Sequence, residues 1–134
     1  MRPKIERFED LVAWQKARIL VREVYRVTKI GAFTKDFGLA SQKQRSAVSV
    51  MANIAEGFDR GNRAEFHQFL SIAKASCAEL RSHLYVASDV GYIRPDEFHQ
   101  LFELAEEVTR ILSALRAAVA RQRNEQRAEK RPSA

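Results

Sequence analysis

The sequence is poor in the residues that interrupt helices. It has three prolines, at positions 3, 95 and 132, and five glycines among 134 residues. The long span between Lys4 and Arg94 therefore contains no proline, which favours long helices over strands and turns. No segment shows the two-residue alternation of a half-buried strand, and no internal repeat is visible.

Cysteine and long apolar runs are also scarce. Cys77 is the single cysteine, which excludes an intramolecular disulfide and favours a reducing compartment. It lies on the apolar stripe of its segment, so we expect a buried thiol rather than a reactive one. No apolar run approaches the roughly 20 residues of a membrane span, and no signal-peptide core is present at the N-terminus. These absences predict a soluble, cytoplasmic protein that does not associate with a membrane.

Motifs for catalysis are missing as well. The sequence has no glycine-rich phosphate loop, nucleophile elbow or HExxH motif. Di-metal helical bundles use Glu-x-x-His on two helices, but none of His67, His83 and His99 has a glutamate three residues before it. Glu79 and His83 are spaced as a surface pair on one helix. We therefore predict no enzymatic activity, no cofactor and no metal site.

Four segments carry the apolar spacing of three and four residues that is typical of amphipathic helices. We predict helices over about 8–28, 38–60, 63–90 and from Pro95 to about 120, separated by short connections that contain glycine. Short connections make successive helices antiparallel. The predicted fold is all-α, an antiparallel up-down-up-down four-helix bundle.

The net charge of +6 is concentrated at the two ends of the chain. Residues 1–7 carry a net charge of +2 and residues 121–134 one of +3, whereas residues 8–120 carry only +1. We expect 1–7 to form a basic N-terminal arm, 8–120 to form the bundle as one domain, and 121–134 to form a basic disordered tail, because apolar side chains nearly vanish there.

One stretch of the second predicted helix, Ala47–Phe58, combines an apolar stripe with polar residues. Asn53 and Glu56 lie on or beside this stripe, and Gly57 follows them. One interpretation is a ligand or partner site. The other is structural: Asn53 and Glu56 hydrogen-bond to groups of other helices or loops, while Gly57 permits a close approach or ends the helix.

Several motifs of the predicted helices and turns occur in an order that resembles a known family. In order they are FEDLVAWQKA (8–17), GLASQKQRSAVSV (38–50), NIAEGF (53–58), EFHQFLSIAKAS (65–76), AEL (78–80) and GYI (91–93). The chain is similar to the bacterial four-helix bundle proteins that are encoded in intervening sequences of large-subunit (23S) ribosomal RNA genes.

The resemblance implies an architecture and an assembly rather than a reaction. Members of this family are four-helix bundles that form homo-oligomeric rings, pentamers among them, and no catalytic residues come with the family. A related branch comprises the accessory proteins of diversity-generating retroelements, which bind nucleic acid and a reverse transcriptase. The resemblance therefore implies further copies of the chain, RNA or DNA, and a protein such as a reverse transcriptase as partners.

Basic residues carry the functional prediction with the most content. Lys43 and Arg45 lie near the start of the second helix, and the tail adds Arg121, Arg123, Arg127, Lys130 and Arg131. We predict that these side chains contact phosphates, and an oligomer would repeat each small patch. The alternative is a solvated helix surface and a solubilising tail. Aromatic stacking has less support, because Trp14, Tyr25 and most phenylalanines lie on apolar stripes.

Two hypotheses from different classes follow. In the first, the protein is a non-enzymatic accessory factor that binds RNA or DNA as a ring and bridges it to a partner protein. In the second, it is a self-assembling interaction scaffold without a nucleic-acid role, which uses wide apolar faces on the first and fourth helices. Steep salt dependence of RNA or DNA binding would favour the first hypothesis.

Overall fold

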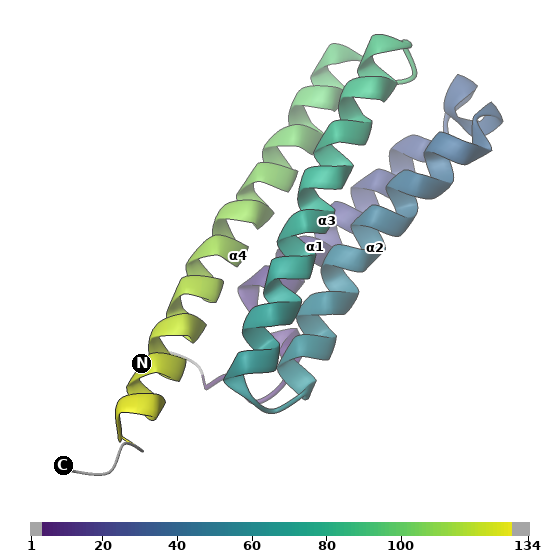
Figure 1. Cartoon of the computed structure of the whole chain (residues 1–134). Coiled ribbons are helices and arrows are strands. Elements are labelled where there is room, and N and C mark those ends of the chain that lie inside the picture. The colour runs from purple at the N-terminus through teal and green to yellow at the C-terminus, as the bar shows by residue number, and fades with distance from the viewer. Residues whose placement is uncertain (1–3, 130–134) are drawn as a thin grey trace.

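The computed structural model describes residues 4–129 and is built from four antiparallel helices (Figure 1). Each helix packs against its neighbours along the chain, and the first also packs against the fourth, so the four surround one core. No β-strand occurs in this described part, which confirms the predicted four-helix bundle. The elements are α1 (Val12–Thr28), α2 (Phe37–Asp59), α3 (Arg63–Asp89), α4 (Pro95–Glu129) and the short 3-10 helices η1 (Phe8–Asp10) and η2 (Gly31–Lys35).

The core consists of the apolar stripes that the sequence shows at helical spacing. In α2 the stripe of Ala47, Val50 and Ile54 is fully buried. It packs with matching stripes from the other three helices, and Cys77 of α3 is buried among them, as expected. Burial of such stripes is the main source of helix stability in a bundle, because packing of the amphipathic face contributes more than intrinsic helix propensity.

Side-chain caps fix where the helices begin. The Asp36 carboxylate accepts the backbone N–H of Leu39 at the start of α2, at 3.1 Å, and Asn62 accepts that of Glu65 at the start of α3, at 2.8 Å. The Asp36 carboxylate also accepts a hydrogen bond from the Tyr92 hydroxyl, at 3.0 Å. This second bond joins the entry of α2 to the α3–α4 turn.

The structure corrects two predicted boundaries. The first helix begins at Val12 rather than Phe8, because Leu11 is extended and the Asp10 side chain accepts the N–H groups of Glu6 and Arg7. The last helix does not end near residue 120 but continues to Glu129, past the α2–α3 turn (Figure 1). Residues 121–129 are therefore helical rather than a disordered tail.

Candidate nucleic-acid interface

Lys43 is not a surface cation, and the prediction that it contacts phosphate is wrong. Its side chain is 1% exposed and lies on the buried stripe of α2, four residues before Ala47. The Nζ atom lies 4.8 Å from the centroid of the Phe33 ring and has no hydrogen-bond partner among the described residues. Burial lowers the pKa of Lys43 to about 8, because a desolvated ammonium is unfavourable.

The other predicted basic residues are spread over the molecule. Arg45 is exposed on α2, whereas Arg121, Arg123 and Arg127 belong to the last turns of α4. Lys130 and Arg131 lie outside the described residues. Arg45 is thus on a different helix from the arginines of α4, and the structure shows no contact that joins them into one site.

Asn53, Glu56 and Gly57 are explained by local packing. The Asn53 amide donates to the backbone oxygen and the hydroxyl of Ser49 on its own helix, at 2.8 and 3.0 Å, and not to another helix. Glu56 is exposed and accepts from Arg60, at 3.0 Å. A Cβ atom at Gly57 would lie 2.6 Å from the Cβ of Phe69, so glycine is needed for the close approach of α2 and α3. A role of these residues in partner binding stays a prediction.

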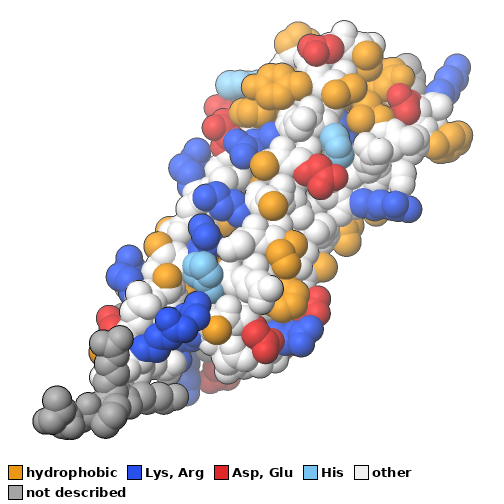
Figure 2. All heavy atoms as spheres, viewed as in Figure 1, with side chains coloured by type: hydrophobic (Ala, Val, Ile, Leu, Met, Phe, Trp, Pro, Cys, Tyr) orange, Lys and Arg blue, Asp and Glu red, His pale blue; other side chains and the backbone are white. Residues whose placement is uncertain are grey.

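A different set of basic side chains lies along the contact between α3 and α4. Lys74 and Arg81 of α3, together with Arg116 and Arg123 of α4, form what we call the basic seam. Each pair is spaced by seven residues, which returns a side chain to nearly the same face of a helix. Figure 2 shows lysine and arginine side chains in a row along this face, over α3 and α4.

His67 of α3 lies close to the seam cations of α4 and so shows how the two helices are placed relative to one another. It precedes Lys74 by seven residues, and its pKa is lowered, first by burial and then by repulsion from Arg116 and Arg123. Near the end of the seam, the Arg63 guanidinium of α3 donates to the Gln122 side chain of α4, at 3.1 Å. The cations of both helices therefore share one surface.

The seam cations are not neutralised within the described part of the chain. None of the four seam residues has a carboxylate within 4.0 Å there, unlike Lys16, which pairs with Glu107 at 3.2 Å between α1 and α4. The Nε atoms of Arg81 and Arg116 are shielded from solvent and make no hydrogen bond to residues 4–129. Guanidinium groups that are not paired with a carboxylate are suited to an anionic ligand.

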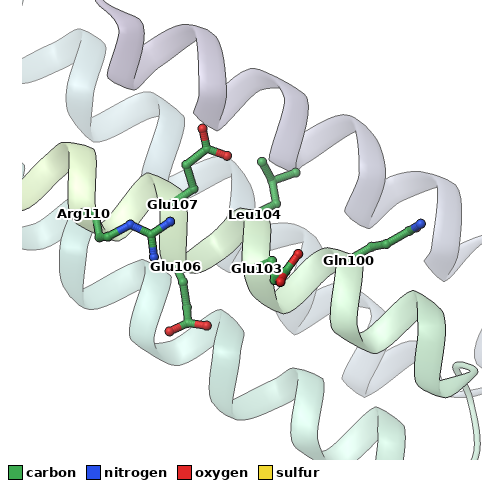
Figure 3. Close-up of a pocket in the computed structure, with 6 residues that line it drawn as sticks. All are labelled: Gln100, Glu103, Leu104, Glu106, Glu107 and Arg110. Atoms are coloured by element: carbon green, nitrogen blue, oxygen red, sulfur yellow. The ribbon is translucent and has the colours of Figure 1, made fainter.

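Acidic side chains border the seam near the start of α4. Glu103, Glu106 and Glu107 line a shallow hollow together with Arg110, and Glu106 points toward α3 whereas Glu107 points toward α1 (Figure 3). These carboxylates disfavour a phosphate in the hollow. Because α3 and α4 are antiparallel and Arg63 meets Gln122, Arg81 lies at the level of these carboxylates, whereas Lys74, Arg116 and Arg123 lie further from them.

Arginines on α1 form a second basic surface. Arg18 and Arg22 are exposed one helical turn apart and, with Arg26 and Lys29, line an open depression on this helix. Arg26 is paired with Glu23, and Arg18 and Lys29 lie over aromatic rings. The cations of this surface come from α1 and the residue that follows it, and Met51 of α2 also lines the depression, whereas the seam combines cations from two helices.

The model of the 23S rRNA-intervening sequence protein family matches residues 9–114, which is most of the bundle. The chain belongs to this family. The resemblance seen in the motifs is thereby confirmed. No curated protein is significantly similar to this member of the 23S rRNA-intervening sequence protein family.

A solved structure supports the fold of this family member. The chain is similar to a crystal structure from Bacteroides thetaiotaomicron VPI-5482, described as a protein of unknown function from the S23 ribosomal protein family. The TM-score is 0.72 at 25% identity, and the match covers 79% of this chain and 96% of that chain. The likeness extends over the bundle and assigns no activity.

The sequence contains signals for both the buried lysine and the seam. Lys43 precedes Ala47 and Val50 by four and seven residues, so it falls on the same stripe and could have been assigned to the core. The seven-residue spacing of Lys74 with Arg81, and of Arg116 with Arg123, marks two basic stripes. Their juxtaposition depends on the register of α3 against α4, which the sequence alone does not give.

Proposed function

We propose that this chain is a non-enzymatic accessory protein that binds RNA or DNA through the basic seam. The single observation that carries this proposal is the group of four cations from two helices, none of which is paired with a carboxylate of the described residues. Affinity for nucleic acid comes largely from cations that replace the counterions of the phosphates. Membership of a family named after an rRNA intervening sequence supports RNA as the first ligand to test.

The finer form of this proposal concerns assembly and a partner protein. In an oligomer of several copies each seam is repeated, and simultaneous contacts raise the effective affinity for a long strand. Bridging to a second protein, for which the sequence resemblance suggests a reverse transcriptase, belongs to the same proposal. Light scattering on the protein with and without RNA measures both the number of copies and the formation of a complex.

The test is binding of single-stranded and duplex RNA and DNA across a salt series. We expect the affinity to fall steeply with salt, with a slope that reflects the number of phosphates contacted. Replacement of Arg116 and Arg123 by glutamine should reduce that slope by about 1 to 2. The matched control removes Arg18 and Arg22 from α1, which changes the net charge equally and should leave the slope nearly unchanged.

The result that would contradict the proposal is equally clear. If the α1 control reduces the slope as much as the seam variant, binding depends on overall charge and not on the seam. If wild-type protein binds none of the four nucleic acids at low salt, the nucleic-acid function itself is wrong.

A second candidate function is a protein-interaction scaffold, which exposed apolar side chains favour. Ile72 and Val86 of α3 are 42% and 45% exposed and are spaced by 14 residues, so they share one stripe. Val12 and Ile19 of α1 are also exposed. Within residues 4–129, α4 has no exposed large apolar side chain, but several of its apolar side chains are only partly buried, namely Phe98, Phe102, Leu104, Ile111 and Leu115. A stable oligomer without nucleic-acid binding would support this alternative.

A further inference from the structure

We propose that the aromatic cluster of Tyr85, Phe98 and Phe102, next to the basic seam, stacks on an unpaired base, so that the ligand of the seam is single-stranded nucleic acid. This inference rests on the proposed function and narrows its ligand. It follows from the geometry of the cluster, its position relative to the cations, and the acidic groups around it.

The cluster is a set of three rings in mutual contact between α3 and α4. The ring centroid of Tyr85 lies 5.2 Å from that of Phe98 and 5.3 Å from that of Phe102, and the two phenylalanines stack on each other at 5.3 Å. Each ring is therefore held by the two others. A platform whose rings are already ordered loses little conformational entropy when a base stacks on it.

The rings are accessible to a ligand although they belong to the bundle. Tyr85 is 53% exposed, and Phe98 and Phe102 are each partly exposed. Figure 2 shows large hydrophobic side chains gathered on the same face as the row of cations, at the end where α3 meets α4.

The cluster continues the seam on both helices. Tyr85 follows Arg81 by four residues, and Phe102 precedes Arg116 by 14, so these two aromatic residues lie on the stripes of the seam cations of their own helices. Arg81 is thus one turn, or about 5 to 6 Å along the helix axis, from the aromatic platform. A strand that stacks a base on the platform can place its next phosphates beside Arg81 and Lys74.

Acidic groups around the platform favour a base over a phosphate there. Glu106 points toward α3, beside the row that contains Phe102, and the Glu103 carboxylate lies 3.1 Å from Nε2 of the exposed His99 on α4. A duplex presents its phosphates on its outside and would bring them toward these carboxylates. An uncharged base avoids this repulsion, and a carboxylate can accept hydrogen bonds from its exocyclic amino group.

The seam cations would bind phosphates and the aromatic cluster would bind a base, and this combination differs from a surface that binds by charge alone. Cations bind the backbone of any nucleic acid, whereas stacking requires bases that are not already stacked on their neighbours in a duplex. The platform therefore adds affinity only for single strands. RNA and DNA have the same base chemistry here, and both are included in the test.

The experiment compares strands with and without bases, bound to the full chain. Wild-type protein and the Tyr85→Ala variant are titrated with a DNA strand of about 12 nucleotides, an abasic strand of equal length, the corresponding RNA, and a duplex. We expect Tyr85→Ala to weaken binding of the base-containing strands about tenfold and to change binding of the abasic strand and the duplex less than twofold.

Two further variants separate stacking from folding. Tyr85→Phe keeps the ring and should bind the single strands as wild type does. Phe37→Ala removes an aromatic side chain that is 80% exposed at the start of α2 and is not part of the three-ring cluster, so it should leave every affinity unchanged. Thermal unfolding of each variant shows that the fold is retained.

The inference is overturned if Tyr85→Ala weakens binding of the abasic strand or of the duplex as much as binding of the base-containing strands. It is equally overturned if the variant weakens binding of none of these ligands. It is also overturned if the variant changes the mass of the particle in light scattering instead of its affinity, because the cluster would then join copies of the chain. In each case, the proposed function still stands if replacement of Arg116 and Arg123 by glutamine reduces the dependence of nucleic-acid affinity on salt. If wild-type protein binds none of these nucleic acids, both the inference and the proposed function are wrong.

Discussion

Lys43 illustrates how one side chain can reduce the stability of a core. Its ammonium lies against the Phe33 ring without a hydrogen-bond partner among the described residues, and its pKa is lowered from 10.5 to about 8. Such a shift corresponds to about 3 kcal/mol of unfavourable free energy for the charged form at neutral pH. A favourable cation–π contact of about 2 kcal/mol offsets part of this cost.

Replacement of Lys43 by methionine should stabilise the protein at pH 7, by about 1 to 3 kcal/mol in the free energy of unfolding. The unfolded chain binds more protons than the folded one between pH 8 and 10.5, so wild-type stability rises relative to the variant through that window. The advantage of Lys43→Met should therefore shrink as the pH rises. Chemical denaturation of both proteins at several pH values measures the difference.

The comparison between variant and wild type removes the effect of other groups. Burial raises the pKa of Cys77 to about 11, which lowers stability as the pH rises above 9, but equally in both proteins. Arg45→Met on the exposed side of α2 serves as the control and should change stability little. An advantage of Lys43→Met that stays constant from pH 7 to 10 would show that the lysine is not buried in its charged form.

Gly57 limits how closely α2 and α3 approach. A Cβ atom there would meet the Cβ and Cγ of Phe69 at 2.6 and 3.3 Å, and Phe66 at 3.2 Å. Gly57→Ala should therefore destabilise the protein by about 1 to 3 kcal/mol, although alanine is the better helix former. Thermal and chemical unfolding measure the loss.

Gly38 provides the matched control on the same helix. A Cβ atom there would make an ordinary contact of 3.7 Å with the Asp36 carboxylate, so Gly38→Ala should be neutral or stabilising by up to about 1 kcal/mol. Equal effects of the two substitutions would contradict the close approach at Gly57.

At the scale of elements, Asp36 joins two parts of the bundle that are far apart in sequence. It caps α2 through Leu39 and accepts a hydrogen bond from Tyr92 after α3. This acceptor favours the protonated phenol and raises the pKa of Tyr92. The entry of α2 and the α3–α4 turn are therefore stabilised by the same carboxylate.

Asp36→Ala should cost about 1 to 3 kcal/mol, more than Asn62→Ala, because it removes the cap of α2 and the bond to Tyr92 together. Tyr92→Phe should cost about 1 kcal/mol in the wild-type background and almost nothing in the Asp36→Ala background. A double-mutant cycle measured by chemical denaturation gives the coupling. A coupling near zero would mean that the Asp36–Tyr92 bond contributes no stability.

The helices themselves were predictable because their stripes and breaks are strong local signals. The missing prolines, the glycines between segments and the caps at Asp36 and Asn62 placed α2 and α3 within one residue of their observed ends. The last helix was less predictable. Its residues 121–129 carry almost no apolar side chains and therefore show no helical periodicity, whereas the structure continues the helix to Glu129.

The candidate site was less predictable than the fold. Sequence position suggested that Lys43 and Arg45 act together, but helical periodicity directs one into the core and the other to solvent. The seam joins residues more than 40 positions apart, such as Lys74 and Arg116. Only the antiparallel register of α3 and α4 brings them onto one surface.

At the scale of the whole molecule, the distribution of charge matters more than its total. Residues 8–120 have a net charge of only +1, yet the seam lies on one side and the carboxylates around the α4 hollow lie nearer one end. A polyanion is therefore attracted to a defined part of the surface rather than to the whole bundle.

The central claim is that nucleic acid binds along α3 and α4. The most direct measurement is ultraviolet cross-linking of a single-stranded RNA to the full chain, followed by mass spectrometry of the peptides that carry the adduct. We predict adducts within 63–89 and 95–129, and their loss when Arg116 and Arg123 are replaced by glutamine. Adducts confined to α1, which contains Arg18 and Arg22, would contradict the account.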